Sequence, residues 1–236
     1  MQFVRRPGLP SVLIAASMLL GACASTGETS SVFLSMVPAQ VSSAAWEQDV
    51  QAFEAKDAEA PPPKGAVLFI GSSSIRFWDT LAADFPQVQV INRGFGGSEL
   101  RDSTWYAGRL VIPHAPRQVV IYAGDNDLHS GRSPLQLRND FRAFVQRLRR
   151  DLPEVRIAYI SNKPSPARLQ LLEVQREANR LLRAEAEASG VDYIDVFTPM
   201  LDERGQPLET LFVEDRLHLD REGYALWKQV VAPYLR

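Results

Sequence analysis

Residues 66–75 read AVLFIGSSSI, a short apolar run that ends in a glycine and three serines. Five consecutive apolar residues bounded by turn-forming residues are typical of a strand that is buried on both faces of a parallel sheet. Four later segments have the same character, and we expect them to be strands as well: residues 88–91, 118–122, 156–160 and 191–196. The sequence therefore predicts a five-stranded sheet whose first strand leads into a serine-rich turn.

Segments with a helical pattern separate these strands. Apolar residues at Leu137, Phe141, Phe144 and Leu148 recur every three or four positions, which places them on one face of a helix over residues 134–150. Further helices are expected just before Pro61, over residues 77–85, within 99–110, and over 167–188 and 221–235. Alternating strands and helices predict an α/β, doubly wound fold, a five-stranded parallel sheet with helices on both faces.

The composition excludes several classes of protein. The chain has 236 residues, 45% of them hydrophobic and 23% charged, and its formal net charge is −2. These values are ordinary for a globular domain and exclude a disordered or collagen-like chain. The chain also lacks the strongly basic character of a nucleic-acid-binding protein. Its single cysteine excludes an intramolecular disulfide and a multi-cysteine zinc site.

The amino terminus has the pattern of a targeting segment. Arg5 and Arg6 precede an apolar stretch, residues 9–22, which is shorter than the roughly 20 residues that a membrane-spanning helix needs. The stretch ends in Leu20-Gly21-Ala22-Cys23, which resembles the signal of bacterial lipoproteins, with the only cysteine of the chain at the lipidation position.

We therefore expect three parts: a lipoprotein signal peptide over residues 1–22, a tether over 23–43 and a folded domain over 44–236. Cys23 would carry lipid and anchor the protein in the bacterial cell envelope. Ala24, a residue other than aspartate after the cysteine, points by the same resemblance to the outer membrane, with the domain facing the periplasm. The alternative is that Cys23 lies in an ordinary signal peptide or a membrane stub.

Polar residues follow four of the predicted strands, and the carboxyl ends of parallel strands meet at one edge of a sheet. The segments are Gly71-Ser72-Ser73-Ser74, residues 93–98 (RGFGGS), Gly124-Asp125-Asn126-Asp127 and residues 214–219 (EDRLHL). Each alone also fits a helix cap, a turn or an exposed pair of side chains. Together they supply a hydroxyl, backbone donors, an amide and a histidine three residues after an aspartate. Acyl transfer needs these parts as nucleophile, oxyanion hole and general base.

Cofactor sites fit these segments less well. The glycine spacing matches neither a phosphate-binding loop nor a dinucleotide-binding loop, so no cofactor is expected. Asp125 and Asp127 are candidate metal ligands, but no further acidic cluster completes such a site, and no metal is expected.

The four segments, in this order, resemble the SGNH hydrolase family, which is also called the GDSL family. The resemblance implies a flavodoxin-like sheet and a serine esterase or lipase. It makes Ser73 the nucleophile, His218 the general base and Asp215 the residue that orients the histidine. It also assigns the oxyanion hole to the N–H groups of Ser73 and Gly97 and to the side chain of Asn126.

The resemblance covers residues 66–236 and departs from the family pattern at one position. Ser72 stands where the family usually has an aspartate, so three serines follow one another and Ser74 is a second candidate nucleophile. Trp78 lies five residues after Ser73, where family members often have an aromatic residue, and this spacing favours Ser73.

Other residues near the same edge have more than one interpretation. Lys163 and Arg168 follow the fourth strand and either contact an anionic or polyol substrate or lie in a solvated loop. His129 is a candidate for the pocket wall, whereas His114, close to two prolines, is expected in a surface loop. Three aromatic residues fit either a pocket wall or the core: Phe95, Trp105 and Tyr106.

The sequence thus predicts a membrane-anchored serine esterase that hydrolyses a carboxylic ester through an acyl-enzyme intermediate, without metal or cofactor. Its partners would be a small-molecule ester and the membrane, and not nucleic acid. A lipid, a lysophospholipid or a short acyl ester would fit, because the fold does not decide among them. Two alternatives stay open: an O-acetyl esterase that acts on carbohydrate, and a noncatalytic envelope lipoprotein that binds glycan or lipid in the same cleft.

Overall fold

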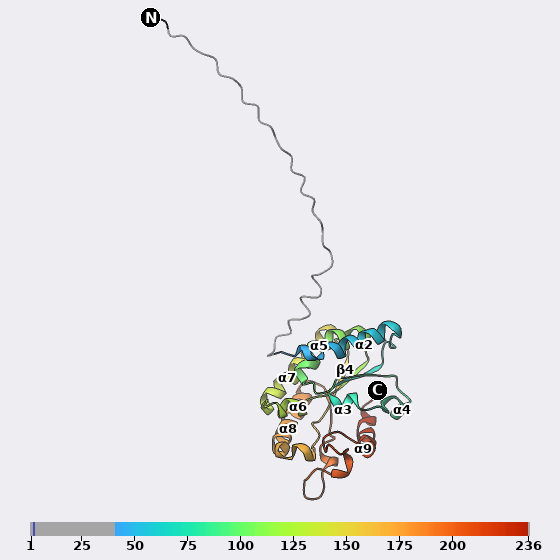
Figure 1. Cartoon of the computed structure of the whole chain (residues 1–236), viewed down its shortest axis with the longest axis vertical. Coiled ribbons are helices and arrows are strands. Elements are labelled where there is room, and N and C mark those ends of the chain that lie inside the picture. Colours follow the sequence, from blue (N-terminus) through green and yellow to red (C-terminus); the bar gives the residue numbers. More distant parts are fainter. Residues whose placement is uncertain (1, 3–40, 236) are drawn as a thin grey trace. The chain divides into compact units, whose positions relative to one another are not determined.

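The computed structural model describes residue 2 and residues 41–235, and residues 41–235 form the fold described here (Figure 1). Apart from residue 2, the predicted signal peptide lies outside the described residues, as do Cys23 and the predicted tether up to residue 40. Within the described part of the chain, no helix is both long enough and apolar enough to cross a membrane.

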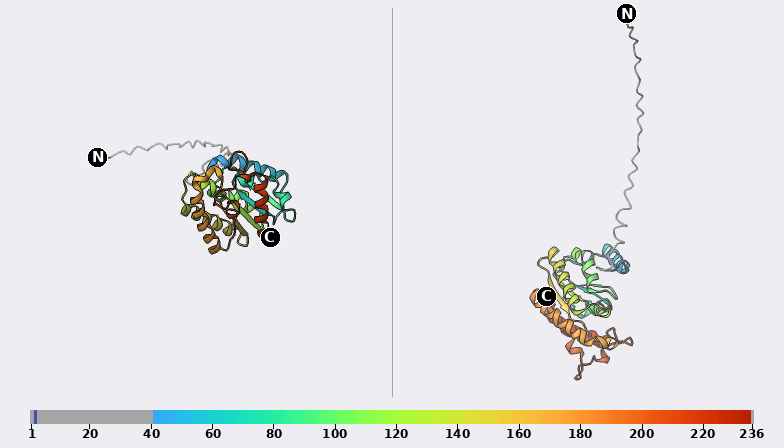
Figure 2. Two further views of the ribbon diagram at one scale, coloured as in Figure 1. Left: turned by 90° about the horizontal axis from the view of Figure 1, so that it is seen from below. Right: turned by 90° about the vertical axis from the view of Figure 1, so that its left-hand side faces the viewer.

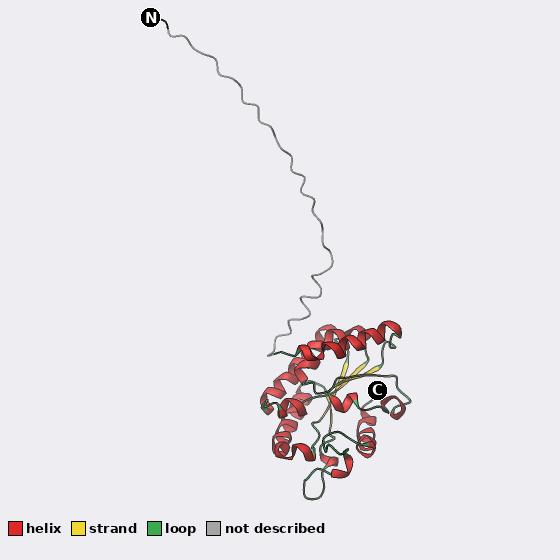
Figure 3. Ribbon diagram, viewed as in Figure 1, coloured by secondary structure: helices red, strands yellow, loops and turns green. Residues whose placement is uncertain are grey.

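A five-stranded, all-parallel sheet lies at the centre of the fold (Figure 3). Its strands are β1 (Val67–Gly71), β2 (Val90–Gly94), β3 (Gln118–Tyr122), β4 (Arg156–Ile160) and β5 (Asp192–Ile194). The spatial order is β2-β1-β3-β4-β5. This is the order of flavodoxin-like folds, and it confirms the predicted fold class.

Two strands differ in extent from the sequence-based expectation. β2 begins at residue 90 instead of 88, because Val88 still belongs to a turn in which its N–H donates to the Phe85 carbonyl at 3.1 Å. β5 is shorter than residues 191–196, because the flanking N–H groups have partners outside the sheet. The Val191 N–H donates to the Ala186 carbonyl at 2.9 Å, and the Val196 N–H donates to Ser161 Oγ at 3.0 Å.

Helices cover both faces of the sheet. One face packs against α2 (Glu47–Glu59), α5 (Leu100–Leu110), α7 (Pro134–Asp151) and α8 (Leu172–Ala188), and the other against α3 (Ser73–Arg76), α4 (Leu81–Asp84) and α9 (Arg221–Val231). Side chains of β1 alternate between the two cores: Leu68 and Ile70 face the first group, and Val67 and Phe69 face the second. The core contacts place α2 and α9 on different faces of the sheet, and both views of Figure 2 draw α2 (blue) at the upper edge of the folded part. Because both faces are buried, the strand has no polar positions.

Short helices complete the described residues. α6 (Asp125–His129) follows β3, and it occupies the segment that the sequence suggested as a turn. The 3-10 helices are η1 (Ala44–Trp46), η2 (Ile112–His114), η3 (Pro166–Leu171), η4 (Thr198–Met200), η5 (Glu209–Leu211) and η6 (Ala232–Tyr234).

Local hydrogen bonds and prolines fix the ends of the long helices. Ser133 caps α7: its Oγ accepts the Gln136 N–H at 3.2 Å, and the Gln136 side chain accepts the Ser133 N–H at 2.9 Å. α9 ends at Val231 and continues as η6, so the helix is shorter than the expected 221–235. Pro233 lacks an N–H and cannot extend the α-helical hydrogen bonds.

The expected helix over residues 77–85 is wrong. The chain instead forms α3 and α4, with a turn at residues 77–80 between them. The turn carries Trp78 into the core, where its ring packs against Phe69 and Phe85 and its Nε1 donates to Asp84 at 2.8 Å. A continuous helix over residues 77–85 would not place the Trp78 ring in the core in the same way. Tertiary packing therefore overrides the helical pattern of the sequence.

The expected single helix over residues 167–188 is also interrupted. η3 precedes α8, and Arg168 has non-helical backbone angles of φ −121° and ψ 31°. The break lets the Arg168 side chain turn into the protein instead of following the helix surface.

His114 is buried, which corrects the expectation of a surface loop. Its Nε2 lies 3.3 Å from an Arg93 guanidinium nitrogen and 3.4 Å from an Asp57 oxygen. Burial and the Arg93 charge lower the pKa of His114, against the opposing effect of Asp57. His114 therefore belongs to a structural ion cluster next to α2.

Candidate active site

Strand β1 ends at the serine-rich turn. Gly71 has a φ of 137°, and a Cβ there would lie 1.9 Å from the Tyr122 carbonyl oxygen, so the position requires glycine. Ser72 and Ser74 are buried, at 3% and 1% exposure, whereas Ser73 at the start of α3 is partly exposed. Of the three serines, only Ser73 presents its side chain to a substrate.

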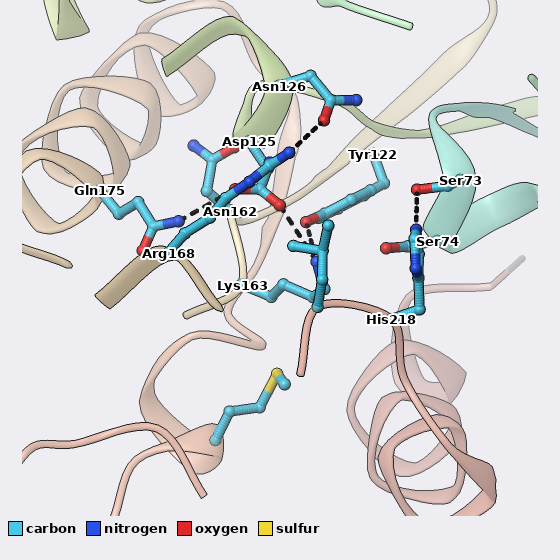
Figure 4. A network of polar contacts seen from close by, with 12 residues as sticks. Ser73, Ser74, Tyr122, Asp125, Asn126, Asn162, Lys163, Arg168, Gln175 and His218 are labelled. Carbon is cyan, nitrogen blue, oxygen red and sulfur yellow. Dashed lines mark hydrogen bonds and ion pairs between the residues drawn. The ribbon is translucent and has the colours of Figure 1, made fainter. Parts of the chain in front are cut away.

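The Ser73 hydroxyl meets a histidine from the carboxyl-terminal part of the chain (Figure 4). Its Oγ lies 2.9 Å from His218 Nε2, and His218 Nδ1 lies 2.6 Å from Asp215 Oδ2. The other Asp215 oxygen accepts the backbone N–H groups of Leu217 and His218 at 2.8 and 2.9 Å. The fold thus joins Ser73, His218 and Asp215, the three predicted catalytic residues, in one chain of contacts.

The environment of Asp215 keeps its carboxylate ionised. Burial favours the neutral acid, but hydrogen bonds from the His218 backbone, the His218 ring and the Leu217 N–H lower the pKa of Asp215 to about 2. An ionised carboxylate holds a proton on Nδ1 of the imidazole, which leaves Nε2 to accept the Ser73 proton. Phe77 supports the ring edge-on, at 5.0 Å between ring centroids.

The glycine-rich loop after β2 lies against Ser73. The Phe95 N–H donates to the Gly71 carbonyl at 2.9 Å, and a Cβ on Gly96 would lie 4.0 Å from the Ser73 Cβ. Within residues 41–235, no hydrogen-bond acceptor takes the backbone N–H of Ser73 or of Gly97. Both predicted backbone donors are therefore available to a ligand.

Asn126, the third predicted oxyanion donor, reaches the same place from α6. Its Nδ2 donates to the Ser98 carbonyl at 3.0 Å, which leaves the second amide hydrogen for another acceptor. The next residue, Asp127, accepts the Leu100 N–H at 3.0 and 3.2 Å and so ties α6 to the start of α5. Burial raises the pKa of Asp127 to about 7, although the Leu100 N–H stabilises the carboxylate.

The two aspartates around Asn126 do not converge on a shared site. Asp127 bonds to the Leu100 backbone, whereas Asp125 faces cationic side chains. Among the described residues, no group of three or more histidine, cysteine, aspartate or glutamate side chains has the arrangement of a metal site.

A buried charge network lies behind Asn126 (Figure 4). Asp125 lies 3.2 Å from Lys163 Nζ and 2.9 Å from an Arg168 guanidinium nitrogen, and it accepts a hydrogen bond from Gln175 at 3.1 Å. Burial alone would raise the pKa of Asp125, but the charges of Lys163 and Arg168 lower it. Lys163 and Arg168 are buried, so their interpretation as a solvated loop is wrong.

The sequence did not indicate that Asp125 and Gln175 belong to this network. One signal was present: an acidic residue and two basic residues follow neighbouring strands, β3 and β4, at the same edge of the sheet. The remaining candidates for a pocket wall differ in how exposed they are. Phe95 and Tyr106 are core residues, whereas Trp105 and His129 are exposed on the surface.

Comparison with known proteins identifies the family. The chain matches the model of the GDSL-like Lipase/Acylhydrolase family over residues 71–226, a span that contains all five predicted catalytic and oxyanion-hole residues. No curated protein matches the chain by sequence.

Solved structures share the fold at low sequence identity. A Streptococcus pneumoniae protein provisionally assigned as a platelet activating factor is 21% identical, with a TM-score of 0.72 over 80% of this chain and 92% of that one. A GDSL-like lipase from Bacteroides thetaiotaomicron is 19% identical, with a TM-score of 0.68 over 78% and 96%. A catalytic mutant of an acetylxylan esterase from Geobacillus stearothermophilus is 17% identical, with a TM-score of 0.60 over 72% and 94%.

The family model spans well over half of the chain, and the sheet order is the one expected of this family. This chain therefore belongs to the GDSL-like lipase/acylhydrolase family and is an ester-hydrolysing hydrolase.

Proposed function

We propose that the protein is a serine esterase that hydrolyses a carboxylic ester through an acyl-enzyme intermediate. The observation that carries the proposal is the 2.9 Å contact between Ser73 Oγ and His218 Nε2, with Asp215 2.6 Å from the other ring nitrogen. A noncatalytic binding protein would have no use for an oriented imidazole on a serine hydroxyl.

In the first half-reaction, the Ser73 oxygen attacks the ester carbonyl carbon while His218 Nε2 takes the hydroxyl proton. The carbonyl oxygen becomes negatively charged and accepts hydrogen bonds from the N–H groups of Ser73 and Gly97 and from the Asn126 amide. When the tetrahedral intermediate collapses, the bond to the alcohol breaks, and His218 gives its proton to the departing oxygen. The acyl group remains on Ser73.

In the second half-reaction, water attacks the acyl-enzyme while His218 again acts as the base. The bond between the acyl carbon and the Ser73 oxygen then breaks, and the proton returns from His218 to Ser73. The products are a carboxylic acid and the free enzyme. Asp215 remains ionised throughout and stabilises the imidazolium that forms twice in each cycle.

A groove next to Phe77, whose ring packs against His218, supports an ester with a sizeable organic group; Ser73 and His218 lie outside its lining. It has a volume of about 570 Å³ and includes two exposed apolar side chains, Phe77 and Val213. An apolar wall next to the base suits a lipid, a lysophospholipid or a short acyl ester.

The second candidate is an O-acetyl esterase that acts on carbohydrate. Polar residues complete the same groove, among them Asp79, Thr80 and Asp220, and such groups can bind sugar hydroxyls. The fold is also shared with the acetylxylan esterase from Geobacillus stearothermophilus.

Turnover of p-nitrophenyl acetate, butyrate and octanoate, together with release of acetate from acetylated xylan, tests both candidates. We expect hydrolysis of at least one ester and none by the Ser73→Ala variant. A preference for the octanoate supports a lipid substrate, and a preference for acetate with activity on xylan supports the second candidate. A folded protein that hydrolyses none of these esters would contradict the proposal.

We also propose that lipid on Cys23 anchors the enzyme in the bacterial envelope, at the outer membrane facing the periplasm. The support is the sequence pattern that ends in Leu20-Gly21-Ala22-Cys23. Mass spectrometry of the membrane fraction should find a mature chain that begins at a lipid-modified Cys23. Cleavage at another residue, or an unmodified Cys23, would contradict this location.

A further inference from the structure

We propose that Arg168 is a positioning residue that fixes the side-chain amide of Asn126 in the orientation that the oxyanion hole requires. An Arg168 guanidinium nitrogen donates to Asn126 Oδ1 at 3.0 Å, and Asn126 Nδ2 donates to the Ser98 carbonyl at 3.0 Å (Figure 4 shows the first of these bonds). The inference rests on the proposed function, because it concerns the same oxyanion hole.

The partners of Asn126 allow only one orientation of its amide. A guanidinium has N–H donors and no acceptor, and a backbone carbonyl is only an acceptor. If the amide were turned by 180°, its NH₂ group would face the Arg168 donors and its oxygen would face the Ser98 carbonyl. Both hydrogen bonds would be lost. Without Arg168, only the Ser98 bond would restrain a torsion that is otherwise broad.

Arg168 is itself contacted on two sides. One guanidinium nitrogen lies 2.9 Å from Asp125 Oδ1, while the other bonds Asn126. Asp125 is contacted in turn by Lys163 and Gln175. Arg168, Asp125, Lys163 and Gln175 are all buried. The planar guanidinium can serve a carboxylate and an amide oxygen at once, which the single nitrogen of lysine cannot do in the same geometry.

The same amide also links two oxyanion donors. The Ser98 carbonyl that Asn126 binds lies one residue after Gly97, whose N–H is the second donor. A displaced Asn126 would therefore also remove one of the hydrogen bonds that hold the glycine-rich loop. The non-helical backbone of Arg168, which interrupts η3, is the local feature that lets its side chain reach this position.

A double-mutant cycle on Arg168 and Asn126 tests the proposal. Asn126→Ala should lower kcat by roughly 10²–10³-fold, because it removes one oxyanion donor. Arg168→Met removes the hydrogen-bond donor to Asn126 Oδ1 and should lower kcat by about 10-fold or more, with a smaller change in KM. In the Asn126→Ala background, Arg168→Met should lower kcat by less than about threefold, because the effects of two residues are not additive when one acts through the other.

Arg142→Met is the matched control. It makes the same substitution at an arginine that donates two hydrogen bonds to Glu185 and has no hydrogen bond or ion pair with Asp125 or Asn126, and it should leave kcat within about twofold of the wild type. Circular dichroism and thermal unfolding report whether each variant is folded. If Arg168→Met does not fold, Arg168→Lys keeps a positive charge beside Asp125 and should show the same non-additivity with Asn126→Ala.

The cycle separates the outcomes. An equal loss of kcat from Arg168→Met in both backgrounds would mean that Arg168 acts on the substrate directly or only on the fold. No loss in the wild-type background would also overturn the proposal. Either result, with an inactive Ser73→Ala variant, would reject the positioning role alone. An active Ser73→Ala variant would instead reject the proposed function.

Discussion

Two aspartates, one in the triad and one in the network behind Asn126, contact basic side chains, and the two pairs differ widely in exposure. The Asp215 side chain is 47% exposed and its partner His218 is 25% exposed, whereas the Asp125 side chain is 5% exposed and its partner Lys163 is 2% exposed. Asp215 orients a group that must exchange protons with substrate and water, so it lies at the surface. Asp125 supports groups that must stay still, so it lies in the interior.

The difference in exposure predicts different consequences of mutation. An exposed ion pair contributes little to folding stability, because water solvates both charges in the unfolded state and screens them in the folded state. Removing one partner of a buried pair leaves an uncompensated charge away from water, which is strongly destabilising. Changes at Asp215 should therefore affect activity, and changes at Asp125 should affect stability.

The largest expected effect is that of Asp215→Asn on catalysis. An amide in place of the carboxylate would favour the wrong tautomer of His218, and kcat should fall on the order of 10⁴-fold. The midpoint of thermal unfolding should change little, because the side chain is about half exposed and the asparagine oxygen can still accept the two backbone N–H groups. Steady-state kinetics and thermal unfolding of the same preparation check both parts. A variant with near-normal kcat would show that the exposed pair does not act as proposed.

The next effect is that of Asp125→Ala on stability. The substitution leaves Lys163 and Arg168 buried without their carboxylate, and the free energy of unfolding should fall by about 3–5 kcal/mol. Urea unfolding followed by circular dichroism measures it. Glu222→Gln, which removes the carboxylate of an exposed ion pair with Arg221, is the control and should stay within about 0.5 kcal/mol. Equal losses of unfolding free energy in the two variants would contradict the claim that the buried pair matters more for stability than an exposed pair.

The smallest expected effect is the pH dependence of folding stability that Asp127 causes. Burial raises the pKa of Asp127 from 3.8 to about 7, so between these values the folded protein keeps a proton that the unfolded chain releases. The contribution of this group to stability is therefore full at acid pH and is lost as the pH rises towards about 7.

Asp127→Asn should remove this dependence, because the amide does not titrate and its oxygen can still accept the Leu100 N–H. Between about pH 5 and about pH 8, the free energy of unfolding of the wild type should fall relative to that of the variant. Denaturant unfolding across this range gives the comparison. Parallel curves for the two proteins would show that Asp127 titrates normally.

The features that the sequence predicted are those that depend on short stretches of chain. Each strand contains a short apolar run, and β1 has no polar residue because both of its faces are buried. The pairing of Asp215 with His218 spans three residues, so one turn of chain brings the two side chains together. The order of the four polar segments then indicated that they share one edge of the sheet.

The features that the sequence did not predict depend on contacts between distant residues. The pattern at residues 77–85 favours one helix, but the place of Trp78 beside Phe69 requires a turn. Lys163 and Arg168 lie 38 and 43 positions after Asp125, and only the sheet order β3-β4 brings them together. A basic residue that follows a strand is interpreted as solvent-exposed unless its buried acidic partner is known.

The central claim is that Ser73 attacks the ester, and covalent labelling with a serine-directed phosphonate tests it most directly. Ser73 is partly exposed and lies 2.9 Å from His218 Nε2, whereas Ser74 is buried. Tandem mass spectrometry should therefore find a single adduct, on Ser73. Ser73→Ala should abolish labelling, and Ser74→Ala should still be labelled. An adduct on Ser74, or labelling of the Ser73→Ala variant at the same rate, would contradict the account.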